Sequence, residues 1–424
     1  MIHPEKVRIS DADKISGLPD EVLVHILSLV DMKEVMHTSV LSKRWRYLWR
    51  SVPSLNFNSH LWRLPNKGEW DIRKEGFMEF VEKTLSLHDG FNVDKFSLYY
   101  YNPSDACARI HEWIALAVSR HVQHLCLGHI TLLPTWLLGQ VTTLELRSVR
   151  IPNQMPYENK ELVFNLELVE NLILQDCDYL AYNTFIISAP KLKYMRVVNK
   201  VCSKIKVCAP SLMLLQFIGE MYEDYSLDNL SSLVTAELRL DCHGSDFLKG
   251  RPVKKKKLRC LNNFLEGICN VQSLTLSTYY FQNWPELFEE WEPIIFHKVK
   301  CLKLTDWQVD GDIGAIDKLL MCFPNIETLR FERTVMLSQK GTGSCEKSGD
   351  QGSLLSVSCM FPHLKNIEIQ NLRRCDNVFN FLEFLVENTL NLESITLKAS
   401  DRMPEYSGKE VVNFCKRRIM RVVI

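Results

Sequence analysis

Side chains that could perform chemistry are few and scattered in this sequence of 424 residues. The segment Asp241-Cys-His-Gly-Ser-Asp246 combines a thiol, an imidazole and carboxylates, which are groups that nucleophilic enzymes and metal sites use. Adjacent residues point in different directions and no partner motif accompanies them, so we expect a loop after a strand. The 14 cysteines include no Cys-x-x-Cys pair, and the Gly-rich phosphate loop, Gly-x-Ser-x-Gly and His-Glu-x-x-His motifs are absent. We therefore predict no catalytic residue, no metal and no cofactor.

A short basic stretch, Arg251-Pro-Val-Lys-Lys-Lys-Lys-Leu-Arg259, carries six basic side chains in nine residues. The stretch fits a nuclear-import signal or a phosphate-binding patch, and it fits a solvated loop between structural repeats equally well. The whole chain has 51 Lys and Arg residues and 51 Asp and Glu residues, so its net charge is zero. This balance predicts a protein that binds neither nucleic acid nor a membrane surface.

A row of polar side chains of both charges is a candidate surface for recognising another protein. These residues lie between or just after the apolar positions of short repeated strings, so on strands they would share the exposed face. Mixed charges suit selective recognition of a protein surface better than binding of a uniformly charged polymer. An ordinary solvated face is an equal alternative for any one position. The candidate target-binding residues are Glu145, Arg147, Arg196, Glu237, Arg239, Lys303 and Arg330, with Gln175, Gln216, Thr275, Glu332, Glu368 and Lys398 in the same row.

The strings that would position this row have the pattern apolar-x-x-apolar-x-apolar, which places alternate side chains on one face of a short strand. Twelve copies run from Val93-x-x-Phe96-x-Leu98 to Leu392-x-x-Ile395-x-Leu397, and their central positions are 19 to 38 residues apart, with a modal spacing of 28. Such a period is typical of leucine-rich repeats, and irregular strands of an ordinary α/β sheet are the alternative. Four copies follow a proline that can end the preceding loop, at Pro190, Pro210, Pro324 and Pro362.

Residues 18–52 predict three short helices. Pro19 suits the first position of the first helix, Asp31 and Glu34 resemble a capping box for the second, and Ser42 can cap the third. The apolar positions of the first and third helices are Val22, Leu23, Ile26, Leu27, Val30, Trp45, Leu48, Trp49 and Val52. A module of about 40 residues has too little interior to bury two tryptophans and this wide face. Either the rest of the chain or a partner protein must cover them.

The segments Asp13-Lys-Ile-Ser-Gly-Leu-Pro-Asp-Glu-Val-Leu-Val-His-Ile-Leu-Ser-Leu29 and Thr38-Ser-Val-Leu-Ser-Lys-Arg-Trp-Arg-Tyr-Leu-Trp49 closely resemble the F-box of plant F-box proteins. The resemblance implies docking on the Skp-type adaptor of an SCF (Skp, cullin, F-box) ubiquitin ligase, and through it on cullin and RING subunits. One departure is Val30-Asp31, where the family often has Leu-Pro; because Asp31 can still cap the next helix, we expect docking to survive. The positions carried over from the family are Leu18, Pro19, Val22, Ile26, Leu27, Val40, Leu41 and Trp45.

The proline-led strings look like the leucine-rich repeats of the same plant family, and Cys359 to Leu397 with Gly408 to Val412 resemble its closing FBD domain. We therefore expect an α/β protein in which a short three-helix F-box module precedes an irregular leucine-rich-repeat solenoid with a parallel sheet on its concave face. The expected domains are an F-box at 11–58, a helical linker at 59–92, leucine-rich repeats at 93–354 and an FBD region at 355–424. Phe77, Phe80, Val81 and Leu85 predict one amphipathic helix in the linker, and the Gly-rich segment 339–353 predicts an exposed insertion.

These expectations describe a non-catalytic substrate-recognition subunit that holds an unidentified target protein beside a ubiquitin-loaded enzyme. The alternative is a leucine-rich scaffold or receptor whose N-terminal helices only cap the solenoid. The longest early apolar run, Val22 to Val30, is far shorter than the roughly 20 residues that span a bilayer, so we expect no membrane segment. Residues 1–10 do not read as a secretion signal, and the expected location is the nucleus, the cytoplasm or both.

Overall fold

The structure is a computed structural model that divides into two compact units, Met1–Pro152 and Asn153–Ile424. The residues that it describes are 15, 17–64, 73–89, 93–101, 107–131, 140–151, 161–178, 183–199, 204–219, 225–240, 251–278, 294–306, 318–332, 361–372, 385–399 and 422–423. The segments Asp241–Asp246, 339–353 and 408–412, on which three of the sequence predictions fall, lie outside these residues. No helix within the described residues is both long and apolar enough to cross a membrane.

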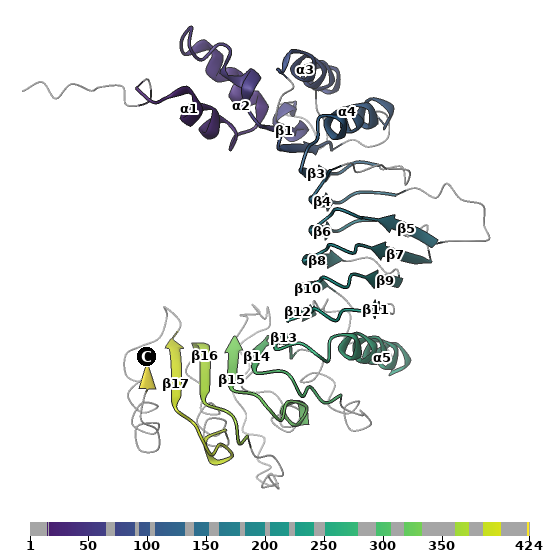
Figure 1. Ribbon diagram of the computed structural model, residues 1–424, viewed down its shortest axis with the longest axis vertical. Helices are drawn as coiled ribbons and strands as arrows, with labels where there is room; N and C mark the ends of the chain where they lie inside the picture. Colours follow the sequence, from purple (N-terminus) through teal and green to yellow (C-terminus); the bar gives the residue numbers. More distant parts are fainter. Residues whose placement is uncertain are drawn as a thin grey trace, which may run out of the picture. The chain divides into compact units, whose positions relative to one another are not determined.

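The first unit begins with a helical module (Figure 1). Helix α1 spans Asp20–Leu27, α2 spans Met32–His37, and two 3₁₀ helices follow, η1 at Thr38–Val40 and η2 at Leu48–Ser51. The predicted third α-helix is wrong, because turns occupy residues 43–47 and only the last four residues before Val52 form a 3₁₀ helix. The turns bring both Trp45 and Trp49 to the inside of the module.

A four-stranded parallel sheet follows in the same unit. Its strands lie in chain order, β1 at Ser54–Asn58, β2 at Lys95–Tyr99, β3 at His124–Gly128 and β4 at Thr143–Arg147. Helix α3 (Lys74–Leu87) lies between β1 and β2 in sequence, and α4 (Cys107–Ser119) lies between β2 and β3. The predicted amphipathic helix is confirmed as α3, which follows the short 3₁₀ helix η3 (Ser59–Trp62). Its Phe77 stacks on Tyr100 and contacts the edge of Trp62, so α3 belongs to the core of this unit.

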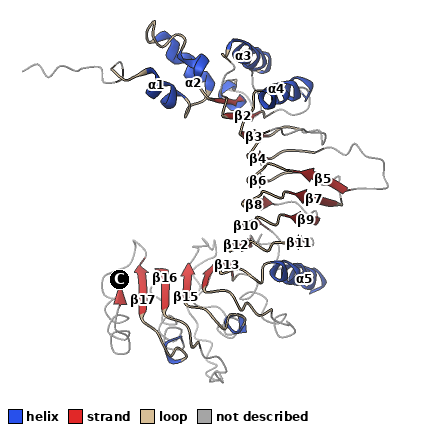
Figure 2. Cartoon of the chain, viewed as in Figure 1, coloured by secondary structure: helices blue, strands red, loops and turns tan. Residues whose placement is uncertain are grey.

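The second unit contains a larger parallel sheet built from the remaining predicted strings and from the short strand β18 (Val422–Val423), which was not predicted. In spatial order its strands are β6 (Asn171–Gln175), β8 (Tyr194–Asn199), β10 (Leu214–Gly219), β12 (Thr235–Leu240), β13 (Ser273–Ser277), β14 (Cys301–Thr305), β15 (Thr328–Glu332), β16 (Asn366–Leu372), β17 (Ser394–Ala399) and β18 (Val422–Val423). The string positions expected to face the core, such as Leu302 and Leu304, are fully buried. The α/β class with a helical module followed by repeated parallel strands is therefore confirmed (Figure 2).

A second, four-stranded sheet in this unit was not predicted. Its order is β11-β9-β7-β5, with β5 at Glu161–Asn165, β7 at Thr184–Ser188, β9 at Lys204–Cys208 and β11 at Tyr225–Asp228. Strands β7 and β9 run directly into the turns that contain Pro190 and Pro210, so these prolines follow a strand of the second sheet. Where the central positions of the repeats are only about 20 residues apart, a returning strand fits and a helix of ordinary length does not.

Helix α5 (Arg251–Gly267) takes the place of such a strand in the longer repeat after β12. Phe264 of α5 contacts Phe217 of β10 and Tyr225 of β11, with ring centroids 5.6 and 5.8 Å apart. The basic stretch at 251–259 therefore begins this helix, and the solvated-loop interpretation is wrong. Lys257 within it is only 1% exposed, because one face of an amphipathic helix must turn toward the core.

Several strands end in a residue with left-handed backbone geometry. His129, Ser148, Asp176 and Asp306 directly follow β3, β4, β6 and β14, with φ angles of 55°, 49°, 49° and 58°. Asp and Asn tolerate this region better than other non-glycine residues. The repeated geometry turns the chain away from the sheet at the same point of each of these repeats.

Candidate functional site

The helical module divides its apolar side chains into a buried set and an exposed set. Leu23, Leu27 and Val35 are at most 3% exposed, and the tryptophans Trp45 and Trp49 are 8% and 5% exposed. The chain itself therefore covers these side chains: α1 packs on η2, and α2 packs on η1, η2 and the strand at Ser54–Asn58. Two of the positions carried over from the F-box resemblance, Leu27 and Trp45, lie in this buried set, so in the free chain they support the surface from behind.

The exposed set forms a candidate adaptor-binding surface on α1 and η1. Val22 and Ile26 are 41% and 43% exposed, and Val40 and Leu41 are 87% and 65% exposed. Leu29 was not among the predicted residues, yet it is 75% exposed. Its spacing of three residues from Ile26 and seven from Val22 could have revealed it, because such positions share one face of a helix. Isolated exposed apolar residues need no explanation, but five of them within the segment from Val22 to Leu41 are a candidate interaction surface.

Arg44 positions the Leu18-Pro19 segment, which directly precedes α1. Its guanidinium lies 2.6 Å from the Asp20 carboxylate at the first residue of α1, and it also donates a hydrogen bond to the carbonyl oxygen of Leu18. Leu18 is half-buried and Pro19 is exposed. Arg44 thus holds the Leu18-Pro19 segment against the turns that precede η2, so the segment and the exposed side chains of α1 are presented together.

Asp31 caps α2, as predicted. Its Oδ1 accepts a hydrogen bond of 2.9 Å from the backbone N–H of Lys33, which satisfies one of the free donors in the first turn. Burial raises the pKa of the Asp31 carboxyl group to about 6, although hydrogen bonds from the Lys33 and Asn58 backbones oppose the rise. The Lys33 side chain donates to the carbonyl oxygen of Leu61 at 2.5 Å, and its Nζ lies 5.0 Å from the Trp62 ring centroid.

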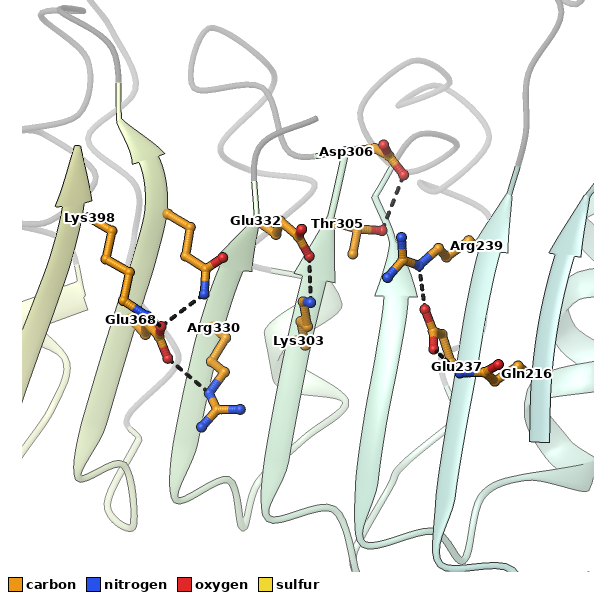
Figure 3. Close-up of polar contacts among 11 residues, drawn as sticks. Gln216, Glu237, Arg239, Lys303, Thr305, Asp306, Arg330, Glu332, Glu368 and Lys398 are labelled. Atoms are coloured by element: carbon orange, nitrogen blue, oxygen red, sulfur yellow. Dashed lines mark hydrogen bonds and ion pairs between the residues drawn. The ribbon is translucent and has the colours of Figure 1, made fainter. Parts of the chain in front are cut away.

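The candidate target-binding residues of the second unit lie on one side of its large sheet and form networks across the strands (Figure 3). Glu237 binds Arg239 on its own strand and accepts a hydrogen bond of 2.8 Å from Gln216 on the neighbouring strand. Lys303 pairs with Glu332. Each of these side chains is half-buried, so the strand surface presents preformed ion pairs rather than isolated charges.

A second network of this face centres on Glu368 of β16. Arg330 lies 3.1 Å from one of its oxygens and Lys398 lies 2.7 Å from the other (Figure 3). The two cations lower the pKa of the Glu368 carboxyl group, with the hydrogen bond from Lys398 as the largest cause. Arg196 of β8 differs from Arg239, Lys303 and Arg330, because it has no ion-pair partner in the described part of the chain.

Two predicted target-binding residues, Glu145 and Arg147, belong to the first unit. They form an ion pair with each other on β4, and Glu145 is only 8% exposed. The structure therefore removes Glu145 from the open polar surface. Its second carboxylate oxygen accepts a hydrogen bond of 3.3 Å from the Cys126 thiol.

Comparison with known families finds an F-box domain at residues 15–57 and an At1g61320/AtMIF1, LRR domain at residues 114–422. F-box domains in general bind Skp-type adaptors, and proteins that join an F-box to leucine-rich repeats are non-catalytic substrate adaptors. The fold and the exposed surface of the helical module place the chain in this class of protein. Because the second match spans more than half of the sequence, the chain belongs to the At1g61320/AtMIF1 LRR family.

Curated relatives come from Arabidopsis thaliana. F-box/LRR-repeat protein At4g14103 is 28% identical over 382 residues, which cover 78% of this chain and 94% of the relative. F-box/LRR-repeat protein At3g59200 is 28% identical over 390 residues, with 82% of this chain and 74% of the relative covered. FBD-associated F-box protein At5g38590 is 36% identical over 175 residues, or 39% of this chain and 41% of its own length. The resemblance to plant F-box/LRR proteins is thereby confirmed, and the boundaries of an FBD region at 355–424 stay a prediction.

Proposed function

We propose that the chain is the substrate-recognition subunit of an SCF-type ubiquitin ligase. The observation that carries the proposal is the exposed apolar set Val22, Ile26, Leu29, Val40 and Leu41 within a matched F-box domain. A Skp-type adaptor would cover this surface and connect the chain to cullin and RING subunits. The chain itself would contribute proximity, because holding a target beside a loaded conjugating enzyme makes the transfer effectively intramolecular.

Co-purification of the full chain with a Skp-type adaptor tests the first half of this proposal. Replacing Ile26 by Asp places a charge in the centre of the exposed set and should weaken adaptor binding by at least about tenfold, which is the effect of losing one well-packed anchor. Met213→Asp is the matched control, because Met213 is similarly exposed, at 52%, but lies in the second unit. Equal adaptor binding by both variants would contradict the proposed surface.

The alternative of a scaffold with capping helices predicts a different result from the same variants. A capping role depends on the buried set, so Ile26→Asp would leave every partner unaffected, and the intact chain would capture no adaptor. The adaptor proposal and the capping alternative are thus separated by one binding experiment on folded protein.

We propose that the target protein binds the polar side of the second unit's large sheet. Arg196 is the most promising anchor, because binding an acidic side chain there would not require an existing ion pair to break. The ion pairs around Glu237 and Glu368 would stay intact and would contribute the shape and the charge pattern that the target recognises. Arg196→Glu should abolish capture of targets that the intact chain enriches, and Lys191→Glu, at an exposed position of the turn before β8, serves as the control. Capture unchanged by Arg196→Glu would place the target elsewhere.

A further inference from the structure

Three side chains able to bind a metal ion meet on the sheet of the first unit. Ligand atoms of His124, Cys126 and Glu145 all lie within 4.8 Å of one another. Throughout the part of the chain that the structure describes, no other group of three His, Cys, Asp or Glu side chains is arranged in this way. None of the three belongs to the adaptor-binding surface, so the group needs an explanation of its own.

Strand geometry fixes the positions of all three. His124 and Cys126 are two residues apart on β3, so their side chains point to the same face of the sheet. The parallel register of β3 and β4 sets Glu145 directly beside Cys126. On the opposite face of β3, Leu125 and Leu127 are fully buried, which prevents a slip of the strand that would exchange the two faces.

Hydrogen bonds already orient Glu145, one of the three possible metal ligands. The Cys126 thiol donates to Oε2 of Glu145 at 3.3 Å, while Oε1 is held by Arg147. A hydrogen-bond donor on the far oxygen is the usual means of orienting a carboxylate ligand. Cys126 and Glu145 are 2% and 8% exposed, whereas His124 is half-buried and forms the open side of the group.

We propose that His124, Cys126 and Glu145 bind one zinc ion, with a water molecule as the fourth ligand. Zinc accepts sulfur, nitrogen and oxygen ligands in a tetrahedral arrangement, and a thiolate ligand disfavours magnesium and calcium. On binding, the thiol of Cys126 releases its proton to solvent, and a zinc–sulfur bond replaces the S–H hydrogen bond to Glu145. One proton is therefore released for each zinc ion.

The position of the three side chains, not their charges, favours a metal ion. Burial and the neighbouring Glu145 raise the pKa of Cys126 to about 12, which opposes formation of the thiolate, so zinc binding has to supply the free energy of releasing this proton. Burial, together with Lys95, lowers the pKa of His124, which keeps the imidazole neutral. The charged and titratable groups on the flanking strands are Lys95 and Tyr99 on β2 and Glu145 and Arg147 on β4. Lys95 stands beside His124 in the strand register and opposes a bound cation.

Titration of the full chain with cobalt, a spectroscopic substitute for zinc, tests the proposal. We expect a near-ultraviolet thiolate-to-cobalt band that zinc displaces, with release of about one proton for each ion. Cys126→Ser should remove the band and weaken zinc binding by about a hundredfold, since sulfur is the softest ligand of the set. Cys322→Ser is the matched control, because Cys322 is also a buried thiol but lies in the second unit.

Two milder variants keep the test decisive if Cys126→Ser fails to fold. His124→Asn, at the open side of the group, should weaken zinc binding by at least about tenfold, whereas Lys95→Gln should strengthen it several-fold by removing a repelling charge. A cobalt band that persists in Cys126→Ser, or zinc affinities that are equal in the intact chain, His124→Asn and Lys95→Gln, would overturn the proposal.

Discussion

At the scale of single residues, the carboxyl group of Asp31 has an unusually high pKa. The carboxyl group does two things at once, because it caps α2 and lies partly inside the first unit. Capping favours the ionised group and burial opposes it, and burial has the larger effect on its pKa. The stability of the helical module should therefore depend on pH through this residue.

Folding raises the pKa of Asp31 from 3.8 to about 6, so the folded state favours the protonated form. The stabilisation from protonation is complete below pH 3.8 and is lost as the pH rises through 6. Asp31→Asn keeps a capping side chain without the charge, so at pH 7 it should stabilise the first unit by about 1 kcal/mol, after allowance for partial exposure.

Urea unfolding of both proteins between pH 4 and pH 8 measures this effect. The stability difference between Asp31→Asn and the intact chain should grow as the pH rises from 4 to 7. Glu112→Gln, at an exposed position of α4, is the control and should show a difference that does not change with pH. A constant difference for Asp31→Asn would contradict the assigned role of burial.

Single residues also show which features could not be predicted from the sequence. The sequence correctly predicted that Asp31 caps α2 and that Val22 and Ile26 lie on an apolar face, because capping and helical spacing are local properties. It did not separate Ile26, which is exposed, from its neighbour Leu27, which is buried. Both belong to one wide apolar face, and only packing against the rest of the unit decides which part of that face is covered.

At the scale of elements, the strands of the large sheets were predictable except β1 and β18, which lie outside the predicted strings, and those of the second sheet were not. Each large-sheet string buries three side chains in a fixed pattern, as Val299 just before β14 does with Leu302 and Leu304 within it, and the pattern recurs along the chain. Strand β9 buries only Ile205 and Val207, and this short alternation carries little signal by itself. The third predicted helix failed for a related reason, since helical spacing of Trp45 and Trp49 is also compatible with a series of turns that buries both.

Arg44 gives the first prediction at this scale, because it joins α1 to the turns before η2. Arg44→Met removes the bonds to Asp20 and to the Leu18 carbonyl while keeping a long side chain. We expect adaptor affinity to fall by about three- to tenfold through loss of a charge-assisted hydrogen bond, with a small change in unfolding.

Arg44→Lys is the informative control for that variant. Lysine keeps the positive charge but cannot contact two separate oxygens with the same fixed geometry. An intermediate adaptor affinity, measured by surface plasmon resonance, would agree with the role of Arg44 in positioning Leu18 and Pro19. Affinity unchanged in both variants would show that the segment is positioned without Arg44.

Helix α5 gives the second prediction at this scale. Phe264 is 1% exposed and contacts the rings of Phe217 and Tyr225, so it links α5 to both sheets of the second unit. Phe264→Ala should destabilise this unit by about 3–5 kcal/mol, the usual cost of removing a buried aromatic ring. Leu390→Ala, at a position that is 65% exposed, should change stability by less than about 0.5 kcal/mol. Denaturation followed by circular dichroism would compare the two, and equal midpoints would contradict the packing of α5.

At the scale of the whole molecule, the proposed adaptor surface and the proposed target surface lie in different compact units. Neither surface shares a residue or a hydrogen-bonding partner with the other. Variants at sites that share no contacting residue usually have additive effects. The two binding activities should therefore be separable by mutation.

The double variant Ile26→Asp with Arg196→Glu tests this separability. Ile26→Asp should reduce adaptor binding and leave target capture intact, Arg196→Glu should do the reverse, and the double variant should show both losses unchanged in size. Binding assays with adaptor and target present separately would measure each effect. A variant at one surface that alters binding at the other by more than about threefold would reveal coupling between the units.

The contacts of Lys33 show that the helical module depends on residues beyond the matched F-box domain. The matched domain ends at residue 57, yet Lys33 of α2 bonds to Leu61 and lies over Trp62, and β1 at Ser54–Asn58 pairs with β2 at Lys95–Tyr99. His88 Nε2 also lies 3.0 Å from the carbonyl oxygen of Val52. A transplanted fragment that stops at residue 57 would leave these partners behind. Genetic recombination that exchanged F-boxes between relatives would thus keep these contacts together only where the crossover falls after β2.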